Sequence, residues 1–196
     1  MSTKSDKILE PNLRDKLIKS GLAILHEKGL QGLTLRACAA HCGVSHAAPA
    51  HHFQGLRGLL NGIAASGFEE LNTFMIEARN LRSDDPREQI VGICEGYLEF
   101  AKARSALFTL MFNSGQELDM DGSLSVASAK AYETLSSACR PFETGDGVEE
   151  LTETLVWSLV HGLASLQVGG RFRMPNLECE PPPIGDLLSG LSLRHR

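Results

Sequence analysis

The sequence has no long apolar run, and this absence excludes a simple helical membrane protein. None of its 196 residues lies in a stretch that approaches the roughly 18 to 20 consecutive apolar residues needed to span a bilayer. Residues 1–10 are polar and lack the apolar core of a signal peptide, so we expect a cytoplasmic protein. The five cysteines are an odd number scattered along the chain, which does not suit a disulfide framework and fits a reducing compartment.

Catalytic signatures are also scarce. We find no segment with the pattern of a strand, and no Gly-rich phosphate loop. The residues that most resemble a metal-binding motif are Cys38, His41 and Cys42. On a helix, however, His41 points away from the two cysteines, and no second cysteine pair supplies further ligands. We therefore expect no catalytic residue, no metal and no cofactor, and we interpret these cysteines as core residues. An enzyme is kept as an alternative.

The charge is unevenly distributed along the chain. A net charge of −5 would ordinarily argue against a nucleic-acid partner. Residues 1–60, however, hold eight basic and four acidic side chains, a balance of +4, whereas the remainder has a balance of −9. Five of the seven histidines also lie in the basic part. A basic N-terminal part followed by an acidic remainder is typical of a DNA-binding domain joined to a domain that does not contact DNA. The alternative is that the surface charges are segregated by chance.

Residues 34–53 contain two short helical segments separated by a glycine. Thr34 can cap the first segment, because its hydroxyl can accept from a backbone N–H that has no other partner. Gly43 can adopt the positive φ that ends this helix, and Val44 can fill the small core below the turn. Ser45 is then expected to cap the second helix. This arrangement predicts a helix-turn-helix, although capped helix pairs with glycine turns also occur in ordinary bundles.

The spacing of several residues narrows this interpretation. They are Ala39, the triplet Gly43-Val44-Ser45, the pair His52-Phe53 and the pair Leu59-Leu60. In these positions the chain resembles the DNA-binding domain of the TetR family of bacterial transcription regulators, and the resemblance covers about the first third of the chain. The family usually has Tyr where this chain has Ala50 and Lys where it has Leu56, and in the family both tend to hold DNA phosphates.

The predicted DNA-binding residues fall into two groups. Those that form or flank the reading helix are Ser45, His46, Ala47, Ala48 and His51. Those placed for phosphate contact are Thr34, Arg36, His52 and Arg57. Because the reading helix offers no Arg, Asn or Gln for bidentate base contacts, we expect modest direct readout of sequence and some reliance on phosphates and DNA shape.

The rest of the chain reads as helices, so we predict an all-α protein. Its N-terminal three-helix helix-turn-helix DNA-binding domain is expected at 1–60, and its C-terminal helical domain for ligand binding and dimerisation at 61–196. The helices expected in the second domain are 56–81, one that starts at Asp85-Pro86, 107–112, one that Ser123 caps and Pro141 ends, 146–169 and 184–191.

The segment 146–169 is apolar on two faces, which indicates that it is covered on both sides. In a body this small the second cover is most simply another subunit, so we predict a two-fold homodimer that binds a palindromic double-stranded DNA operator. The predicted interface consists of Leu155, Leu159, Gly162 and Leu166, together with Leu187, Leu188 and Leu191 from the last helix.

Trp157 and the pair His161-Gly162 resemble the Trp…His-Gly motif of one C-terminal domain found in TetR-type regulators. That resemblance implies a helical body that dimerises and often holds a small-molecule pocket. The predicted pocket residues are Tyr97, Phe108, Met111, Phe112, Tyr132, Leu135, Trp157 and His161, although a dry apolar core would give the same pattern. A core His161 without a ligand contact is the alternative for that residue.

These features together predict a repressor that a small, largely apolar effector of unknown identity releases from its operator. The alternative is a helical small-molecule-binding or interaction module whose DNA binding is weak or lost, a reading that Ala50 and Leu56 favour.

Overall fold

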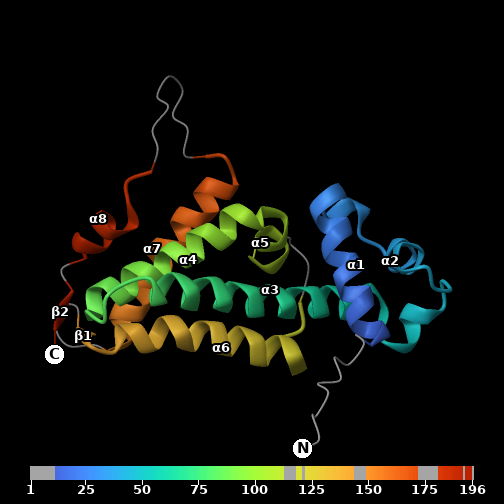
Figure 1. Cartoon of the computed structure of the whole chain (residues 1–196), viewed down its shortest axis with the longest axis horizontal. Coiled ribbons are helices and arrows are strands. Elements are labelled where there is room, and N and C mark those ends of the chain that lie inside the picture. Colours follow the sequence, from blue (N-terminus) through green and yellow to red (C-terminus); the bar gives the residue numbers. More distant parts are fainter. Residues whose placement is uncertain are drawn as a thin grey trace, which may run out of the picture. The chain divides into compact units, whose positions relative to one another are not determined.

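The computed structural model describes a helical chain (Figure 1). The described residues are 12–112, 118–120, 122–143, 149–171, 181–191 and 193–195. The predicted all-α class is confirmed, and the chain divides into two compact units, Met1–Ile63 and Ala64–Arg196. In the described part of the chain, no helix is both long enough and apolar enough to cross a membrane.

The first unit begins with helix α1 (Leu13–Lys28), whose two ends are set by local residues. Asn12 Oδ1 accepts a hydrogen bond from Asp15 N at 3.0 Å, and Gly29 ends the helix with a φ of 66°. Gly21 lies where α1 meets helix α3 (Gly55–Asn80), because a Cβ atom on it would stand 2.5 Å from Ile63 Cδ1. The core of this unit contains Leu17, Leu25, Leu33, Cys38, Ala39, Leu59 and Ile63.

Helix α2 (Leu35–Cys42) follows a short 3-10 turn, η1 (Leu30–Gly32), and it has the predicted caps. Thr34 Oγ1 accepts from Ala37 N at 3.0 Å, which confirms the expected N-cap. Gly43 has a φ of 69°, in the left-handed region, and the next N–H, that of Val44, donates to Ala39 O at 3.0 Å. The turn that the sequence predicted is therefore present, with α2 packed against α1.

The second helix of the motif differs from the prediction. It is a short 3-10 helix, η2 (Ala48–His51), preceded by Ala47, and no side chain caps it, so Ser45 is not the cap. The physical reason is Pro49, which has no N–H to donate to the carbonyl of Ser45 and whose ring would crowd that carbonyl in an α-helix. The backbone bonds instead run over three residues, as from Ala48 N to Ser45 O at 3.0 Å.

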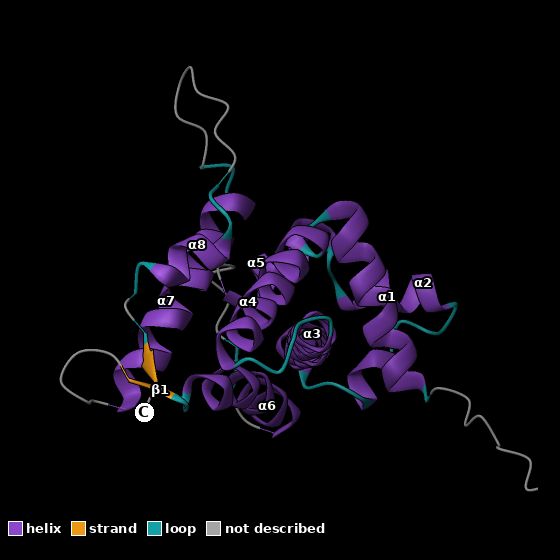
Figure 2. Cartoon of the chain, turned by 60° about the vertical axis from the view of Figure 1, so that its left-hand side comes forward, coloured by secondary structure: helices purple, strands orange, loops and turns teal. Residues whose placement is uncertain are grey.

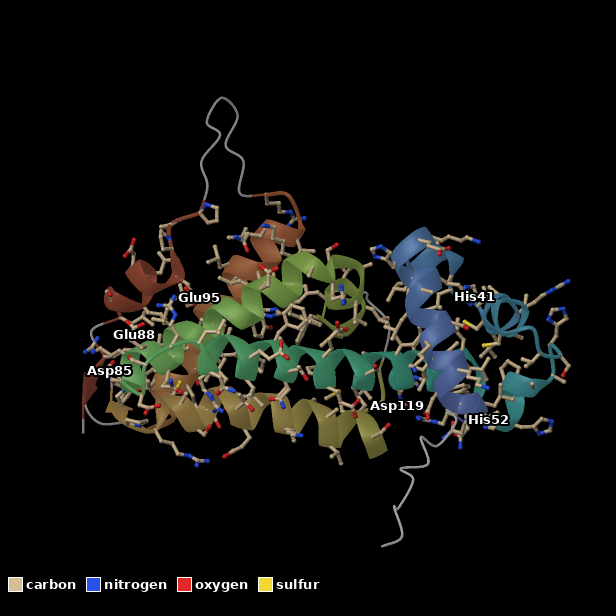
Figure 3. All side chains as sticks on the ribbon, in the orientation of Figure 1. His41, His52, Asp85, Glu88, Glu95 and Asp119 are labelled. Atoms are coloured by element: carbon tan, nitrogen blue, oxygen red, sulfur yellow. The ribbon has the colours of Figure 1, made fainter. Side chains whose placement is uncertain are left out.

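The second unit is built around helix α4 (Pro86–Ala103). Four other helices pack against it, namely α5 (Ser105–Phe112), α6 (Gly122–Cys139), α7 (Glu149–Val168) and α8 (Ile184–Ser189). Figure 2 shows the later part of α3 beside α4 and α6. The start of α4 is confirmed, because Asp85 Oδ1 accepts from Arg87 N at 2.9 Å and from Glu88 N at 3.2 Å. Arg82 ties the preceding turn to α4 through Glu88 and Glu95 (Figure 3).

Two glycines of α4 allow it to approach α3 very closely. A Cβ atom on Gly96 would lie 2.3 Å from Phe74 O and 2.7 Å from Met75 Cα. A Cβ atom on Gly92 would lie 2.8 Å from Arg79 Cα. Since these neighbours are backbone atoms that no rotamer change can move, only glycine fits at either position.

Several predicted boundaries need correction. The sequence indicated no strand, but β1 (Phe142–Glu143) pairs antiparallel with β2 (Arg194–His195), and strands of two residues are too short to show an alternating pattern. Helix α6 already includes Gly122 and Ser123, so Ser123 is not its cap. Helix α8 ends at Ser189, which leaves Leu191 beyond it. The first residues of the helix expected at 146–169 fall outside the described residues, which resume at Glu149.

Candidate DNA-reading surface and ligand cavity

The nine residues predicted to contact DNA lie on or beside the turn of the helix-turn-helix. Eight are exposed and Ala48 is half-buried; the exposed ones are Thr34, Arg36, Ser45, His46, Ala47, His51, His52 and Arg57. His52 is labelled in Figure 3. Pro49 and Phe53 are buried beneath η2, and the Arg14 guanidinium stands 5.5 Å from the centre of the Phe53 ring. The short helix is thus anchored by its apolar side, and its polar side faces outward.

The cluster of Cys38, His41 and Cys42 connects α2 to α1. Ser20 Oγ lies 3.0 Å from His41 Nδ1 and 2.9 Å from Cys42 Sγ. Cys38 is fully buried, and burial foremost raises the pKa of its thiol to about 11, so it stays protonated. Among the residues that the structure describes, no group of three or more His, Cys, Asp or Glu side chains could hold a metal ion.

The second unit contains an apolar cavity of about 470 Å³. Six of the eight predicted pocket residues line it: Tyr97, Met111, Phe112, Tyr132, Leu135 and Trp157. The other two, Phe108 and His161, are not among the described lining residues, and Phe108 is fully buried. The ring centres of Tyr132 and Trp157 are 5.5 Å apart, and these side chains are 40% and 42% exposed, so they stand at the mouth of the cavity.

The sequence singled out Tyr132 and Leu135 of α6, but not the other residues with which α3 and α6 line the cavity. Phe68, Leu71 and Met75 line it from α3, and Ser125 and Ser128 line it from α6. The α3 residues belong to a regular apolar stripe, which predicts burial but does not distinguish a cavity wall from a packed core. No signal in the sequence marks the two serines, because small polar residues are common on any helix face.

His161 lies behind the cavity wall and makes a hydrogen bond to one of the lining residues. Its Nδ1 atom is 2.8 Å from the Tyr97 hydroxyl, and its Nε2 atom is 3.4 Å from Ser165 Oγ. The imidazole packs against aromatic rings, with its centre 4.9 Å from that of Phe112 and 5.6 Å from that of Phe108. Burial lowers the pKa of His161, so the neutral imidazole is favoured.

Burial foremost raises the pKa of the Tyr97 hydroxyl, and the side chain of Trp157 lowers it to a smaller extent. The hydrogen bond to His161 Nδ1 gives this hydroxyl a defined partner. Tyr97 thus connects the cavity wall to His161 behind it.

The outward face of α7 carries apolar residues that the described chain covers only in part. Leu151 and Leu166 are 36% and 43% exposed, and Leu155 and Leu159 are half-buried. A Cβ atom on Gly162 would meet no other atom within 4 Å. The predicted interface residues of the last helix lie differently: Leu188 is buried where α8 packs against α4, while Leu187 and Leu191 are half-buried.

Comparison with known proteins finds a family domain in the second unit. The family model described as "Tetracyclin repressor-like, C-terminal domain" matches residues 90–180. The HTH-type transcriptional regulator BetI 2 of Chromohalobacter salexigens is 36% identical over 89 residues, which make up 45% of this chain and 43% of that protein. The chain thus spans less than half the length of this curated relative.

Solved structures share the fold across nearly the whole chain. A protein of unknown function from Rhodococcus sp. RHA1 has a TM-score of 0.72 and 24% identity, with 95% of this chain and 94% of that one covered. The TetR family regulator PfmR from Thermus thermophilus has a TM-score of 0.58 and 18% identity, with 90% and 94% covered. With its helix-turn-helix and its match to a tetracyclin repressor-like C-terminal domain over residues 90–180, the chain is similar to the TetR family of transcriptional regulators.

Proposed function

We propose that the chain is a homodimeric repressor that binds a palindromic DNA operator and releases it when a small, largely apolar molecule occupies the cavity of the second unit. The observation that carries this proposal is the capped helix-turn-helix with its exposed row of polar and basic residues. Such a protein works by binding rather than by catalysis, and it would act in the cytoplasm, where its operator is.

Binding to DNA would depend mainly on phosphate contacts. Arg36 and Arg57 are exposed arginines beside the turn, and Thr34 and His52 flank them. The residues that face the groove are small, so direct readout would rest on the hydroxyl of Ser45 and the imidazoles of neighbouring histidines. The one-turn helix η2 presents few side chains, which supports the expectation of modest base readout and a larger part for DNA shape.

The outward face of α7 supports a dimer. A helix face with Leu155, Leu159 and Gly162 at its centre would bury its apolar side chains against the same face of a second copy. A two-fold axis at this face would relate the two helix-turn-helix domains by the same symmetry as the half-sites of a palindromic operator.

Release from DNA would be transmitted through α3. Phe68, Leu71 and Met75 line the cavity from this helix, and its first residues follow the reading turn directly in the chain. A ligand that displaces these side chains could shift the equilibrium between the DNA-competent and DNA-incompetent conformations only if it binds the incompetent conformation more tightly. A ligand with equal affinity for both conformations shifts nothing.

A gel shift with the DNA upstream of the protein's own gene, at about 50 and 200 mM salt, tests the proposal. We expect specific binding that weakens as salt rises. Arg36→Ala should weaken binding to specific and random DNA alike and flatten the slope of log affinity against log salt by about one unit. Arg171→Ala, an exposed arginine of the second unit, is the matched control and should leave the slope unchanged.

The other candidate function is an interaction module that has lost DNA binding. It is favoured by the exposure of Ala50 and of Leu56, which is 39% exposed, at positions where the family usually has Tyr and Lys. Absence of binding to any DNA at the lower salt concentration would support this module. Turnover of a substrate by protein that ignores DNA would support an enzyme instead.

A further inference from the structure

The cavity is lined by neutral side chains. Among the described residues that line it there is no Lys, Arg, Asp, Glu or His, and the polar groups are those of Tyr97, Ser125, Ser128, Tyr132 and Trp157. Moving an ionised group from water into such a site without a partner of opposite charge is costly. Hydroxyl and indole groups, in contrast, can satisfy one or two polar groups of an uncharged molecule.

The hydrogen bonds around Tyr97 determine which kind of polar group fits. The Tyr97 oxygen lies 2.8 Å from His161 Nδ1. We assign the hydroxyl as the donor, because a phenol O–H is more acidic than an imidazole N–H and a neutral imidazole nitrogen is a good acceptor. In this tautomer the other imidazole nitrogen carries the proton and faces Ser165 Oγ at 3.4 Å. With its own proton committed, the Tyr97 oxygen can only accept a further hydrogen bond.

We propose, resting on the repressor function above, that the ligand is an uncharged, largely apolar molecule with a hydrogen-bond donor directed at the Tyr97 oxygen. His161 is a positioning residue in this site. It does not contact the ligand, but by accepting the proton of Tyr97 it makes the tyrosine oxygen an acceptor, and so selects donors over acceptors of the same shape.

Titration calorimetry with four naphthalene probes tests this selectivity on the whole chain without DNA. The probes are 2-naphthol, which has a donor; 2-methoxynaphthalene, which can only accept; 2-naphthoate, an anion; and trimethyl(2-naphthyl)ammonium, a cation. We expect 2-naphthol to bind about fivefold or more tightly than the methoxy compound, the factor that one hydrogen bond contributes. Both ions should bind more weakly still.

Three variants separate positioning from general damage to the cavity. Tyr97→Phe should bring the ratio of naphthol to methoxynaphthalene affinity close to one. His161→Ala frees the proton of Tyr97 to turn toward the ligand, so the ratio should fall and methoxynaphthalene should gain affinity. His161→Asn retains an acceptor near the position of Nδ1 and should restore the donor preference. His26→Ala, an exposed histidine of the first unit, is the control and should leave the ratio unchanged.

Four results would overturn the inference: tighter binding of either ion, equal affinity for the two neutral probes, a ratio that survives Tyr97→Phe, and absence of binding by every probe. These calorimetric results do not depend on whether the repressor function holds, because that function is tested separately by the gel shift. A protein that binds no DNA but still prefers 2-naphthol would refute the repressor and leave the assignment of the cavity intact.

Discussion

Replacement of Gly96 by alanine tests how closely α3 and α4 are packed in the unit that holds the cavity. The added Cβ would lie 2.3 Å from Phe74 O and 2.7 Å from Met75 Cα, so the two helices would have to separate by about an ångström to reach ordinary contact distances. Because both neighbours are backbone atoms, the shift must move a whole helix and loosen the side chains packed on either side.

The size of the effect follows from two opposing terms. Alanine is favoured over glycine in a helix interior by about 1 kcal/mol. Overpacking of a tight interface costs about 1 to 3 kcal/mol and sometimes more, and the rigid neighbours place this site at the upper end. We therefore expect a net loss of about 2 kcal/mol, which lowers the melting temperature by roughly 5 °C for a chain of this size.

Thermal unfolding followed by circular dichroism at one fixed protein concentration measures this change. Gly185→Ala is the matched control, because a Cβ atom there would meet Val91 at 3.8 Å, an ordinary contact, and the variant should unfold at an unchanged or slightly higher temperature. If Gly96→Ala is as stable as the parent protein, α3 and α4 do not approach each other at this glycine as closely as described here.

Three further predictions concern the outward face of α7 and the half-buried His161. Gly162→Leu should dissociate the proposed dimer, as measured by light scattering, without destabilising the single chain, because the added side chain meets open space within its own chain; an intact dimer would remove Gly162 from the interface. Leu159→Glu should also yield folded monomers, whereas Leu188→Glu should lower the melting temperature itself, because Leu188 is only 4% exposed within its own chain. Burial lowers the pKa of His161 below its ordinary 6.5. Between that lowered pKa and pH 6.5, His161 is therefore protonated in the unfolded chain but neutral in the folded one. Stability should therefore fall as the pH drops from 7 through about 6, by more in the parent than in His161→Asn, and equal slopes would contradict the assignment.

Local interactions explain which features the sequence predicts well. Asn12, Thr34 and Asp85 each accept a hydrogen bond from a backbone N–H two or three residues ahead, so the start of a helix can be inferred from a few neighbouring letters. The positive φ of Gly43 is equally local. The pattern of the sequence does not predict the reduction of the reading helix to one 3-10 turn, which follows from the missing N–H of Pro49.

Contacts between distant residues explain the rest. The pairing of Phe142 with His195 and the close approach at Gly96 depend on partners far along the chain, and neither has a periodic signature. The cavity shows the same limit at the level of single residues. Phe68 and Phe108 are both apolar residues at helical spacing, but the first lines the cavity and the second is packed behind it with His161. The spacing of apolar residues predicts that they are buried. Only the packed structure distinguishes a residue that lines the cavity from one in the solid core.

The geometry of α7 gives the Trp…His-Gly motif a physical meaning. Successive residues of a helix are rotated by about 100°, so Trp157 and His161 lie one turn apart on one side, while Gly162 is turned toward the next face. Trp157 lines the cavity, His161 bonds to Tyr97 behind the cavity wall, and Gly162 lies among the leucines of the outward face. A ligand that competes for the Tyr97 oxygen would thus act on the same helix that we propose joins the two subunits. Two of the five helices around the cavity lead elsewhere: α3 continues from the helix-turn-helix, and α7 carries the proposed interface with the second subunit. On this account, a change in the hydrogen bonding of Tyr97 could affect the second subunit through α7 as well as DNA binding through α3.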